Sequence, residues 1–255
     1  MNIGSALSMQ FLLSKVETEY TMIFSGHDVL DPYFLKECVQ ILESRPDITL
    51  AFSKVKMINE KREITKQNKY IYSFSNCRLE RFFQTICDSG DCSIVQGVFR
   101  HKTIENFTLS GIAGIDRLML NHILWFGNLH IVDRYLYMRR YHRVIDSDEN
   151  YMKRLTNKNV KRDYSLLIAA YLNDFNSLYT TSDRNKTFFF EKLTMILFKY
   201  IAEKRLESFL HKIYAKIRKV ISVLPIFKER KYYCSFCCKK HKFLIKNHTS
   251  KKIYL

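Results

Sequence analysis

The spacing of apolar and polar positions predicts alternating helices and strands over the first 146 residues. Helices are expected where apolar side chains recur every three or four positions, and strands where short apolar or alternating runs lie between turn residues. The predicted helices are Ala6–Val16, Asp31–Ser44, Arg78–Cys87 and Ile112–Phe126. The predicted strands are Tyr20–Phe24, Ile48–Ile58, Ser93–Arg100, Leu129–Val132 and Tyr135–Tyr141. This alternation favours an α/β layer architecture with a partly parallel sheet.

Turn residues set several of these boundaries. Asp31 suits the N-cap of the second helix and Pro32 suits its first position, while Pro46 disfavours helical backbone at the residue before it. Gly127 suits the end of the fourth helix. Residues 59–69 are polar and are expected to form a connection.

The pattern changes in the second half of the chain. Asp146–Asn159 is polar, and Asp163–Tyr179 is predicted as an apolar-rich helix. From Leu206 to Leu224 apolar residues keep the spacing of three and four with Lys and Arg among them, which predicts a basic amphipathic helix. Its alternatives are docking on the protein's own core and lying on an anionic membrane. The predicted regions are 1–146, 147–224 and 225–255.

Composition and charge change the picture mainly for the last quarter. The 255 residues are 47% hydrophobic with 7 Gly and 3 Pro, which is typical of a globular protein with a real core. Residues 1–183 hold 23 Lys and Arg against 21 Asp and Glu, whereas residues 184–255 hold 19 against 4. This asymmetry indicates a polyanionic neighbour for the tail, either nucleic acid or an anionic membrane surface.

The cysteines indicate a reducing compartment. There are 7, an odd number, and no signal-peptide pattern opens the chain, so we expect a cytoplasmic protein that reaches a membrane only peripherally, at the inner face of the plasma membrane. Cys234, Cys237, Cys238 and His241 have ligand types that suit zinc, with His248 as a further ligand. A basic tail with reduced surface cysteines explains the same residues.

Three segments, taken in order, resemble the family 2 glycosyltransferases, and together they cover residues 2 to about 146. The first is an Asn2-Ile3-Gly4 turn followed by a helix, a short apolar strand, the acidic turn Ser25-Gly26-His27-Asp28 and a helix begun by Pro32. In that family this turn carries an Asp-x-Asp motif whose carboxylates hold a divalent cation against the sugar-nucleotide diphosphate. The resemblance thus implies a cation, Mn²⁺ or Mg²⁺, held by Asp28 and His27. The alternative is that Asp28 caps the turn.

The second segment places a candidate base. Gln96-Gly97-Val98-Phe99-Arg100 and the following Leu109–Leu118 resemble the acceptor side of the family, where a helix opens with an acidic pair. Asp116 occupies the place of the second acid, the usual catalytic base, and Ile115 replaces the first. An inverting transfer needs a base because the acceptor hydroxyl must lose its proton as it attacks. The alternative is a favourable charge in a first helical turn.

The third segment is Leu129–Arg143, which resembles the closing strands of the family and contains Arg139, Arg140 and His142. A His near this point reaches the metal in related enzymes, and basic residues contact the diphosphate. Arg suits phosphate because its planar fork makes paired charge-assisted bonds. The alternative is a strand edge with solvated arginines.

The resemblance implies a partial GT-A fold, the three-layer fold of nucleotide-diphospho-sugar transferases, lacking its first strands and followed by a helical basic region. Its implied catalytic residue is Asp116, and His142 joins the implied metal ligands. The implied substrate-binding residues are Asn2, Gly4, Gly97, Arg117, Arg139 and Arg140.

The implied function is sugar transfer from a nucleotide-sugar donor to a glycan or lipid-linked acceptor, in cell-surface polysaccharide or glycoconjugate synthesis. Two alternatives stay open. One is a catalytically degenerate relative that serves as a binding or scaffold subunit, which the incomplete acidic motif favours. The other is a nucleic-acid binder acting through the basic tail, which is less favoured because the tail's aromatic residues are spaced for a helix face rather than for stacking on bases.

Overall fold

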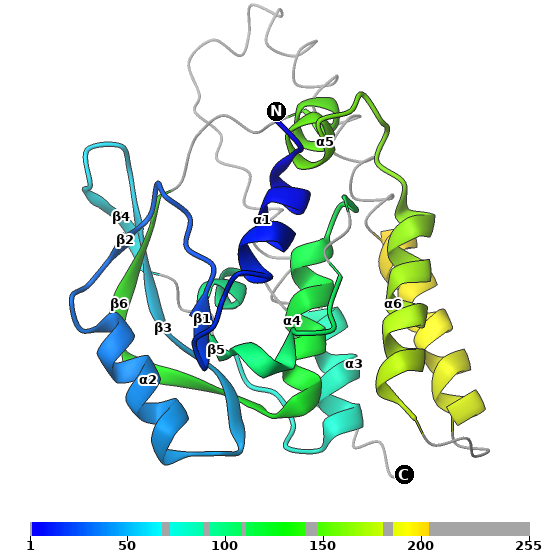
Figure 1. The fold of residues 1–255 in the computed structure, drawn as a ribbon, viewed down its shortest axis with the longest axis horizontal. Helices are drawn as coiled ribbons and strands as arrows, with labels where there is room; N and C mark the ends of the chain where they lie inside the picture. The colour runs from blue at the N-terminus through cyan, green and yellow to red at the C-terminus, as the bar shows by residue number, and fades with distance from the viewer. Residues whose placement is uncertain are drawn as a thin grey trace, which may run out of the picture. The chain divides into compact units, whose positions relative to one another are not determined.

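The computed structural model describes six stretches of the chain, and they form a mixed α/β fold (Figure 1). The chain divides into two compact units, Met1–Ala202 and Glu203–Leu255, and almost all described residues belong to the first. The amphipathic segment from Leu206 and the cysteine cluster from Cys234 lie outside the described residues. The described residues are 2–67, 72–88, 92–108, 111–140, 147–180 and 186–203.

Six strands form one mixed sheet in the order β1-β5-β3-β6-β2, with β4 paired to β3 off this path. β3 and β6 run parallel, and the other pairs are antiparallel. The strands are β1 (Tyr20–Met22), β2 (Val29–Leu30), β3 (Ile48–Ile58), β4 (Ile64–Gln67), β5 (Val98–Arg100) and β6 (Asn128–Arg140).

Helices cover both faces of the sheet. α2 lies on one face, and α3 and α4 lie on the other, with α6 and a helix at 186–203 further out on that second side (Figure 1). The α-helices are α1 (Ser5–Leu13), α2 (Phe34–Ser44), α3 (Arg78–Asp88), α4 (Ile115–Phe126), α5 (Asp148–Thr156) and α6 (Tyr164–Leu178). Two short 3₁₀ helices, η1 (Ser93–Gln96) and η2 (His101–Thr103), flank β5.

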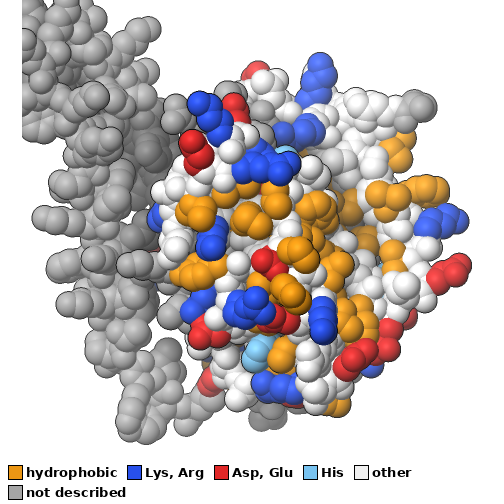
Figure 2. Space-filling model, turned by 90° about the vertical axis from the view of Figure 1, so that its left-hand side faces the viewer, with side chains coloured by type: hydrophobic (Ala, Val, Ile, Leu, Met, Phe, Trp, Pro, Cys, Tyr) orange, Lys and Arg blue, Asp and Glu red, His pale blue; other side chains and the backbone are white. Residues whose placement is uncertain are grey.

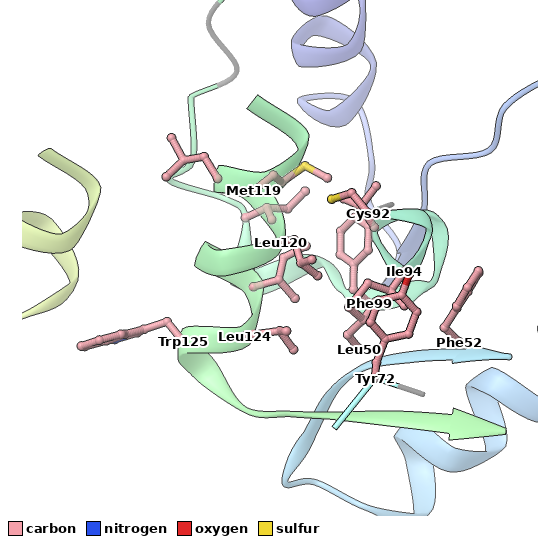
Figure 3. Packing of buried hydrophobic residues seen from close by; sticks show 14 of the residues in the cluster. Leu50, Phe52, Tyr72, Cys92, Ile94, Phe99, Met119, Leu120, Leu124 and Trp125 are labelled. Carbon is pink, nitrogen blue, oxygen red and sulfur yellow. The ribbon is translucent and has the colours of Figure 1, made fainter. Parts of the chain in front are cut away.

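The core is dominated by apolar side chains from β3, β5 and α4, which Figure 3 shows packed between the sheet and the helix. An aromatic group extends it outwards: the ring of Phe82 lies 5.5 Å from that of Trp125 and 5.3 Å from that of Phe175. Leu193 and Leu197 are buried in the same cluster. α6 and the helix at 186–203 therefore share one core with the sheet, whereas the buried residues of α5 form a separate small cluster with Ala6 and Ala113.

Local rules predicted several elements correctly and others only in part. β3 spans Ile48–Ile58 as expected, and α2 ends at Ser44. However, α2 begins at Phe34, because the Asp31 side chain accepts a hydrogen bond from the Tyr33 amide at 2.9 Å and holds a separate turn before the helix.

The structure also differs from the predicted strands in two places, because one predicted strand is interrupted by a turn and two others form a single strand. Of the strand predicted at Ser93–Arg100, only Val98–Arg100 pairs as a strand, because Cys92 in the left-handed region precedes the 3₁₀ helix Ser93–Gln96. The two strands predicted after Gly127 form the single strand β6, whose register against β3 shifts between Ser53 and Val55. Such a bulge interrupts the alternation that the sequence pattern relies on.

Two elements arise in segments whose sequence is polar, β4 in a predicted connection and α5 in the region from 147 to 224 that was predicted to be helical. β4 forms a hairpin with β3 across the turn at Asn59, whose side-chain oxygen accepts from the amides of Lys61 and Glu63. α5 begins at a Ser147 cap, which accepts from the Asn150 amide at 3.1 Å. Side-chain capping stabilises such short elements where apolar periodicity is weak.

Arg81 of α3 joins three segments from a buried position. Its side chain is 4% exposed, and its guanidinium donates to the carbonyls of Leu124, Ser75 and Asn76 and to the Asn128 side chain at 2.6–2.9 Å. Burial lowers the pKa of the guanidinium, with the Arg78 charge acting in the same direction. Arg81 thus donates a hydrogen bond to a carbonyl in the last turn of α4, just before β6 begins.

The buried thiol of Cys38 predicts a loss of stability at alkaline pH. Burial raises its pKa to about 12 from 9.0, and the Glu37 charge adds to the shift. Between these values the unfolded chain has released the proton that the folded chain retains, so rising pH favours unfolding. We expect the free energy of unfolding at pH 9.5 to be about 0.8 kcal/mol lower than at pH 7 from this group alone.

Urea denaturation at pH 7, 8.5 and 9.5 measures this effect. In a Cys38→Ala variant the overall stability falls because a core side chain is shortened, but the decline between pH 8.5 and 9.5 becomes shallower. An equally steep decline in the variant would contradict the assignment to Cys38.

Candidate active site

Asp28 ties the acidic turn to the end of β6. The turn Ser25–Asp28 connects β1 to β2 and is closed by a 2.9 Å hydrogen bond from the Asp28 amide to the Ser25 carbonyl. The Asp28 side chain is 1% exposed. Its Oδ2 accepts from the Tyr137 hydroxyl at 2.6 Å, and its Oδ1 accepts from the Arg140 amide at 2.8 Å. Both carboxylate oxygens are therefore engaged by donors of β6.

A chain of polar side chains continues from Asp28 into η1. The Tyr137 hydroxyl lies 2.5 Å from Oε1 of Gln96, and the Gln96 amide nitrogen lies 2.5 Å from the Ser25 hydroxyl. A phenol has one proton, so Tyr137 cannot donate to both Asp28 and Gln96. With the Gln96 amide turned over, its NH₂ donates to Tyr137 and its carbonyl accepts from Ser25, and every group is satisfied. These hydrogen bonds therefore connect Asp28, through Tyr137 and Gln96, to Ser25 of the same turn.

The environment keeps the Tyr137 hydroxyl protonated. Burial raises its pKa far above the ordinary value near 10, and the hydrogen bond and charge of Asp28 raise it further. Phe34 and Phe52 surround its ring, with centroids 5.8 and 5.2 Å away. Tyr137 is thus a protonated phenol near pH 7 that donates to Asp28.

His27 and Arg140 line the accessible side of this turn. The His27 side chain is 50% exposed, and its Nε2 lies 3.6 Å from Oδ1 of Asp28. The Arg140 guanidinium donates to the backbone carbonyls of His27, Asn59 and Glu60 at 2.8–3.1 Å. Arg140 therefore fixes the acidic turn against the β3–β4 hairpin.

These side chains do not by themselves fit a divalent cation. Hard cations require several accessible oxygen ligands, whereas Asp28 is buried with both oxygens accepting hydrogen bonds and His27 offers one nitrogen. Among the residues that the structure describes, no group of three His, Cys, Asp or Glu side chains is placed to hold a metal ion. His142, the third predicted ligand, lies outside the described residues.

Arg139 points from β6 to η1, where its guanidinium donates to the Ser93 hydroxyl at 2.5 Å. Gln96 of the same short helix reaches Ser25 of the acidic turn. η1 therefore contacts both sides of the candidate site, the turn and the end of β6.

Asp116 lies in the first turn of α4 and is exposed. Its charge acts on Arg117, Tyr151 and Tyr171. Burial is the main reason that the pKa of Tyr151 is raised, and the carboxylate of Asp116 raises it further. An exposed carboxylate at a helix N-terminus is both favourable for the helix and accessible to a substrate.

Arg117 is half-buried beside the helix at 186–203. Burial opposes its charge, but attraction by Tyr200, Cys92, Asp116 and Tyr171 outweighs this effect and raises the pKa of the guanidinium. Of these four groups, the carboxylate is the one that is ordinarily ionised near pH 7. The guanidinium carbon lies 6.0 Å from the centroid of the Tyr200 ring.

The acidic turn and Asp116 lie at the same end of the sheet. α4 leads through Gly127 directly into β6 and runs in the opposite direction, so the N-terminus of α4 and the carboxyl end of β6 face the same end of the sheet (Figure 1), and α4 itself packs against β3 and η1. The Asp28 carboxylate is bonded to Arg140, the last residue of β6. Cys92, which precedes η1, lies close enough to Arg117 to affect its pKa. η1 therefore extends from the Asp28 network towards the first turn of α4.

The predicted substrate-binding residues of the first segment make contacts within the fold. The Asn2 carbonyl accepts from the Asn157 side chain at 2.6 Å, and Asn2 Oδ1 accepts from the Gly4 amide at 3.0 Å. Gly4 has φ +85°, and a Cβ there would lie 2.7 Å from the Leu155 carbonyl oxygen. These two residues dock the start of α1 on the end of α5.

Gly97 likewise packs against the sheet. It has extended backbone, with φ −74° and ψ 176°, so its conformation does not require glycine. The close packing does require glycine, because a Cβ at this position would lie 2.5 Å from the Ala51 carbonyl oxygen of β3. Gly97 thus allows β5 to approach β3 beside the Gln96 side chain.

Tyr137, Gln96 and Ser93 were not predicted as site residues. Each lies in or next to a predicted strand, but the sequence does not show that the three meet at the acidic turn. A Tyr at an inward position of a predicted strand next to a basic pair is the available signal, because a buried phenol needs a polar partner.

The chain matches no model of a known protein family and no curated protein. In the part of the chain that the structure describes, no helix is both long and apolar enough to cross a bilayer.

Proposed function

We propose that this protein is a glycosyltransferase of the GT-A type that moves a sugar from a nucleotide-sugar donor to a hydroxyl of a glycan or lipid-linked acceptor. Asp116 acts as the base. Its carboxylate takes the proton of the acceptor hydroxyl as that oxygen attacks the anomeric carbon. The bond from that carbon to the diphosphate breaks on the opposite face, and the nucleoside diphosphate leaves with the electron pair. The configuration at the anomeric carbon is inverted.

Basic side chains at the end of β6 bind the diphosphate in this proposal. Arg139 and Arg140 are partly exposed and are held in position by Ser93 and by three backbone carbonyls. Guanidinium groups favour phosphate oxygens because they present paired donors with a permanent charge. No step is assigned to a cation, since the described donor set does not fit one.

One observation carries the proposal. The acidic turn is bonded to the end of β6, and the first turn of α4, with its exposed carboxylate, faces the same end of the sheet as the carboxyl ends of the parallel strands β3 and β6 (Figure 1). In open α/β sheets, ligands bind at this edge because loops following parallel strands meet there. The resemblance of three ordered segments to family 2 glycosyltransferases supports the same function.

Calorimetric titration of the purified full chain with UDP- and GDP-sugars, with and without Mn²⁺, tests the proposal. We expect one donor to bind with a dissociation constant between about 1 µM and 1 mM, the usual range for enzyme substrates. Arg139→Gln should weaken that binding about tenfold or more. Arg134→Gln is the matched control, because Arg134 lies on the same strand, within the bulge between Val132 and Tyr135, and pairs with Glu37. Absence of binding by every donor under both conditions contradicts the proposal.

The burial of Asp28 favours a second candidate, a catalytically degenerate relative that binds a nucleotide sugar or glycan without transferring it. Its carboxylate oxygens are already engaged by Tyr137 and Arg140, so the acidic turn offers no free carboxylate. Donor binding without sugar transfer or donor hydrolysis in the wild-type chain, with acceptors supplied, would favour this candidate.

A further inference from the structure

The helix at 186–203 exposes large apolar side chains on the side away from the core. Phe188, Met195 and Phe198 are 56%, 67% and 60% exposed. Leu193 and Leu197 on the opposite side are buried in the main core. A surface helix typically has one apolar side, which faces the core. A helix with apolar residues on two sides is typically covered on both sides, by the core on one and by another molecule or segment on the other.

The exposed residues lie on one face. Phe188, Met195 and Phe198 are separated by seven and three positions, which returns each of them to the same side of a helix with 3.6 residues per turn. The ten residues from the first to the last span about 15 Å along the axis. Glu191 is on the same face, and Lys199 is exposed next to it. We call this surface, made of Phe188, Met195 and Phe198, the apolar stripe.

The chain that follows this helix is strongly basic. Residues 204–255 contain 15 Lys and Arg against 2 Asp and Glu, so their net charge is +13. Residues 1–203 contain 27 against 23 and are themselves slightly basic. On the face that carries α2, β2 and β4, Lys, Arg, Asp and Glu side chains are intermixed with apolar ones (Figure 2). The body therefore has no acidic excess with which to neutralise the basic segment.

We propose that the apolar stripe docks this protein on an anionic lipid surface. The stripe enters the boundary between head groups and acyl chains, and the net positive charge of the sequence that follows the helix favours a surface of anionic rather than neutral lipids. A nucleic acid would satisfy the charge but would leave Phe188, Met195 and Phe198 in water. A lipid surface satisfies both observations. This inference does not depend on the proposed transferase activity.

Flotation of the full chain with vesicles tests the proposal. The vesicles contain either phosphatidylcholine alone or phosphatidylcholine with 30% phosphatidylserine. We expect binding to the anionic vesicles at physiological salt, weaker binding at high salt and little binding to the neutral vesicles. The variant F188S/M195S/F198S should bind anionic vesicles about tenfold or more weakly, because the buried apolar area is lost.

The matched control carries three serine substitutions at exposed aliphatic residues elsewhere, L35S/I64S/V160S. It should bind the vesicles as the wild type does. The emission of Trp125, the single tryptophan, reports folding of each variant because its side chain is 4% exposed in the core.

Two results would overturn the proposal. The first is equal vesicle binding of the stripe variant and the wild type, and a lowered thermal midpoint of that variant would then mean that the protein's own chain covers the stripe. The second is salt-sensitive binding of RNA or DNA by a wild-type chain that does not float with anionic vesicles, which identifies nucleic acid as the partner.

Discussion

Replacing Asp116 by Asn is expected to lower the rate of sugar transfer by about 10²–10⁴-fold while the affinity for the donor changes little. The amide has nearly the same shape as the carboxylate but cannot take a proton from the acceptor hydroxyl. Because Asp116 is exposed in the first turn of α4, the substitution should cost the folded state the favourable helix-dipole interaction, about 0.3–1 kcal/mol, and the attraction between the carboxylate and Arg117. Turnover of the donor identified by titration measures the effect.

Glu43→Gln is the matched control for this prediction. Glu43 is also an exposed acid on a helix, but it lies in the last turn of α2, near the start of β3 rather than its carboxyl end. Its substitution should leave both transfer and donor binding unchanged. Wild-type rates in the Asp116→Asn variant would remove Asp116 as the base and leave the binding candidate as the better account.

Replacing Arg81 by Ala is expected to lower the free energy of unfolding by about 3 kcal/mol or more. The substitution removes hydrogen bonds to three backbone carbonyls and to Asn128, and it leaves buried acceptors such as the Leu124 carbonyl without that donor. Each buried acceptor without a partner costs about 1–3 kcal/mol. Urea denaturation followed by Trp125 emission measures the change, because Trp125 lies next to Leu124 at the end of α4.

Arg134→Ala provides the contrast. Arg134 pairs with Glu37, and its side chain is 53% exposed. Exposed ion pairs contribute about 1 kcal/mol or less, because water screens the charges. Comparable losses for the two substitutions would show that Arg81 is not the buried joint between α3, α4 and β6 that its contacts indicate.

The contacts of the candidate site were not predictable from the sequence. Asp28, Asp116, Arg139 and Arg140 were proposed from three ordered segments, and their roles stay predictions. The sequence did not indicate that the Tyr137 hydroxyl would donate a hydrogen bond to the Asp28 carboxylate, since this bond joins residues 109 positions apart. It depends on the antiparallel pairing of β2 with β6.

The predicted roles of Asn2, Gly4 and Gly97 show a second limit. Each stands in a segment that resembles a substrate-binding region, and in the fold Asn2 makes hydrogen bonds while the two glycines lie against neighbouring backbone. A glycine at a ligand site and a glycine at a crowded backbone have the same sequence signal, because both follow from the absence of Cβ. Only the neighbouring atoms, here the carbonyls of Leu155 and Ala51, distinguish the two cases.

The sequence by itself determined the elements with strong periodicity, such as β3, α2 and α4, and the separation of a nearly neutral body from a basic tail. Period and charge are local properties, so they can be read without knowing which segments meet. The tertiary structure decided the joining of β6 across its bulge, the shared core of α6 with the sheet, and the engagement of Asp28 by Tyr137 and Arg140. These features depend on strand register and on side chains distant in the chain, which local pattern does not specify.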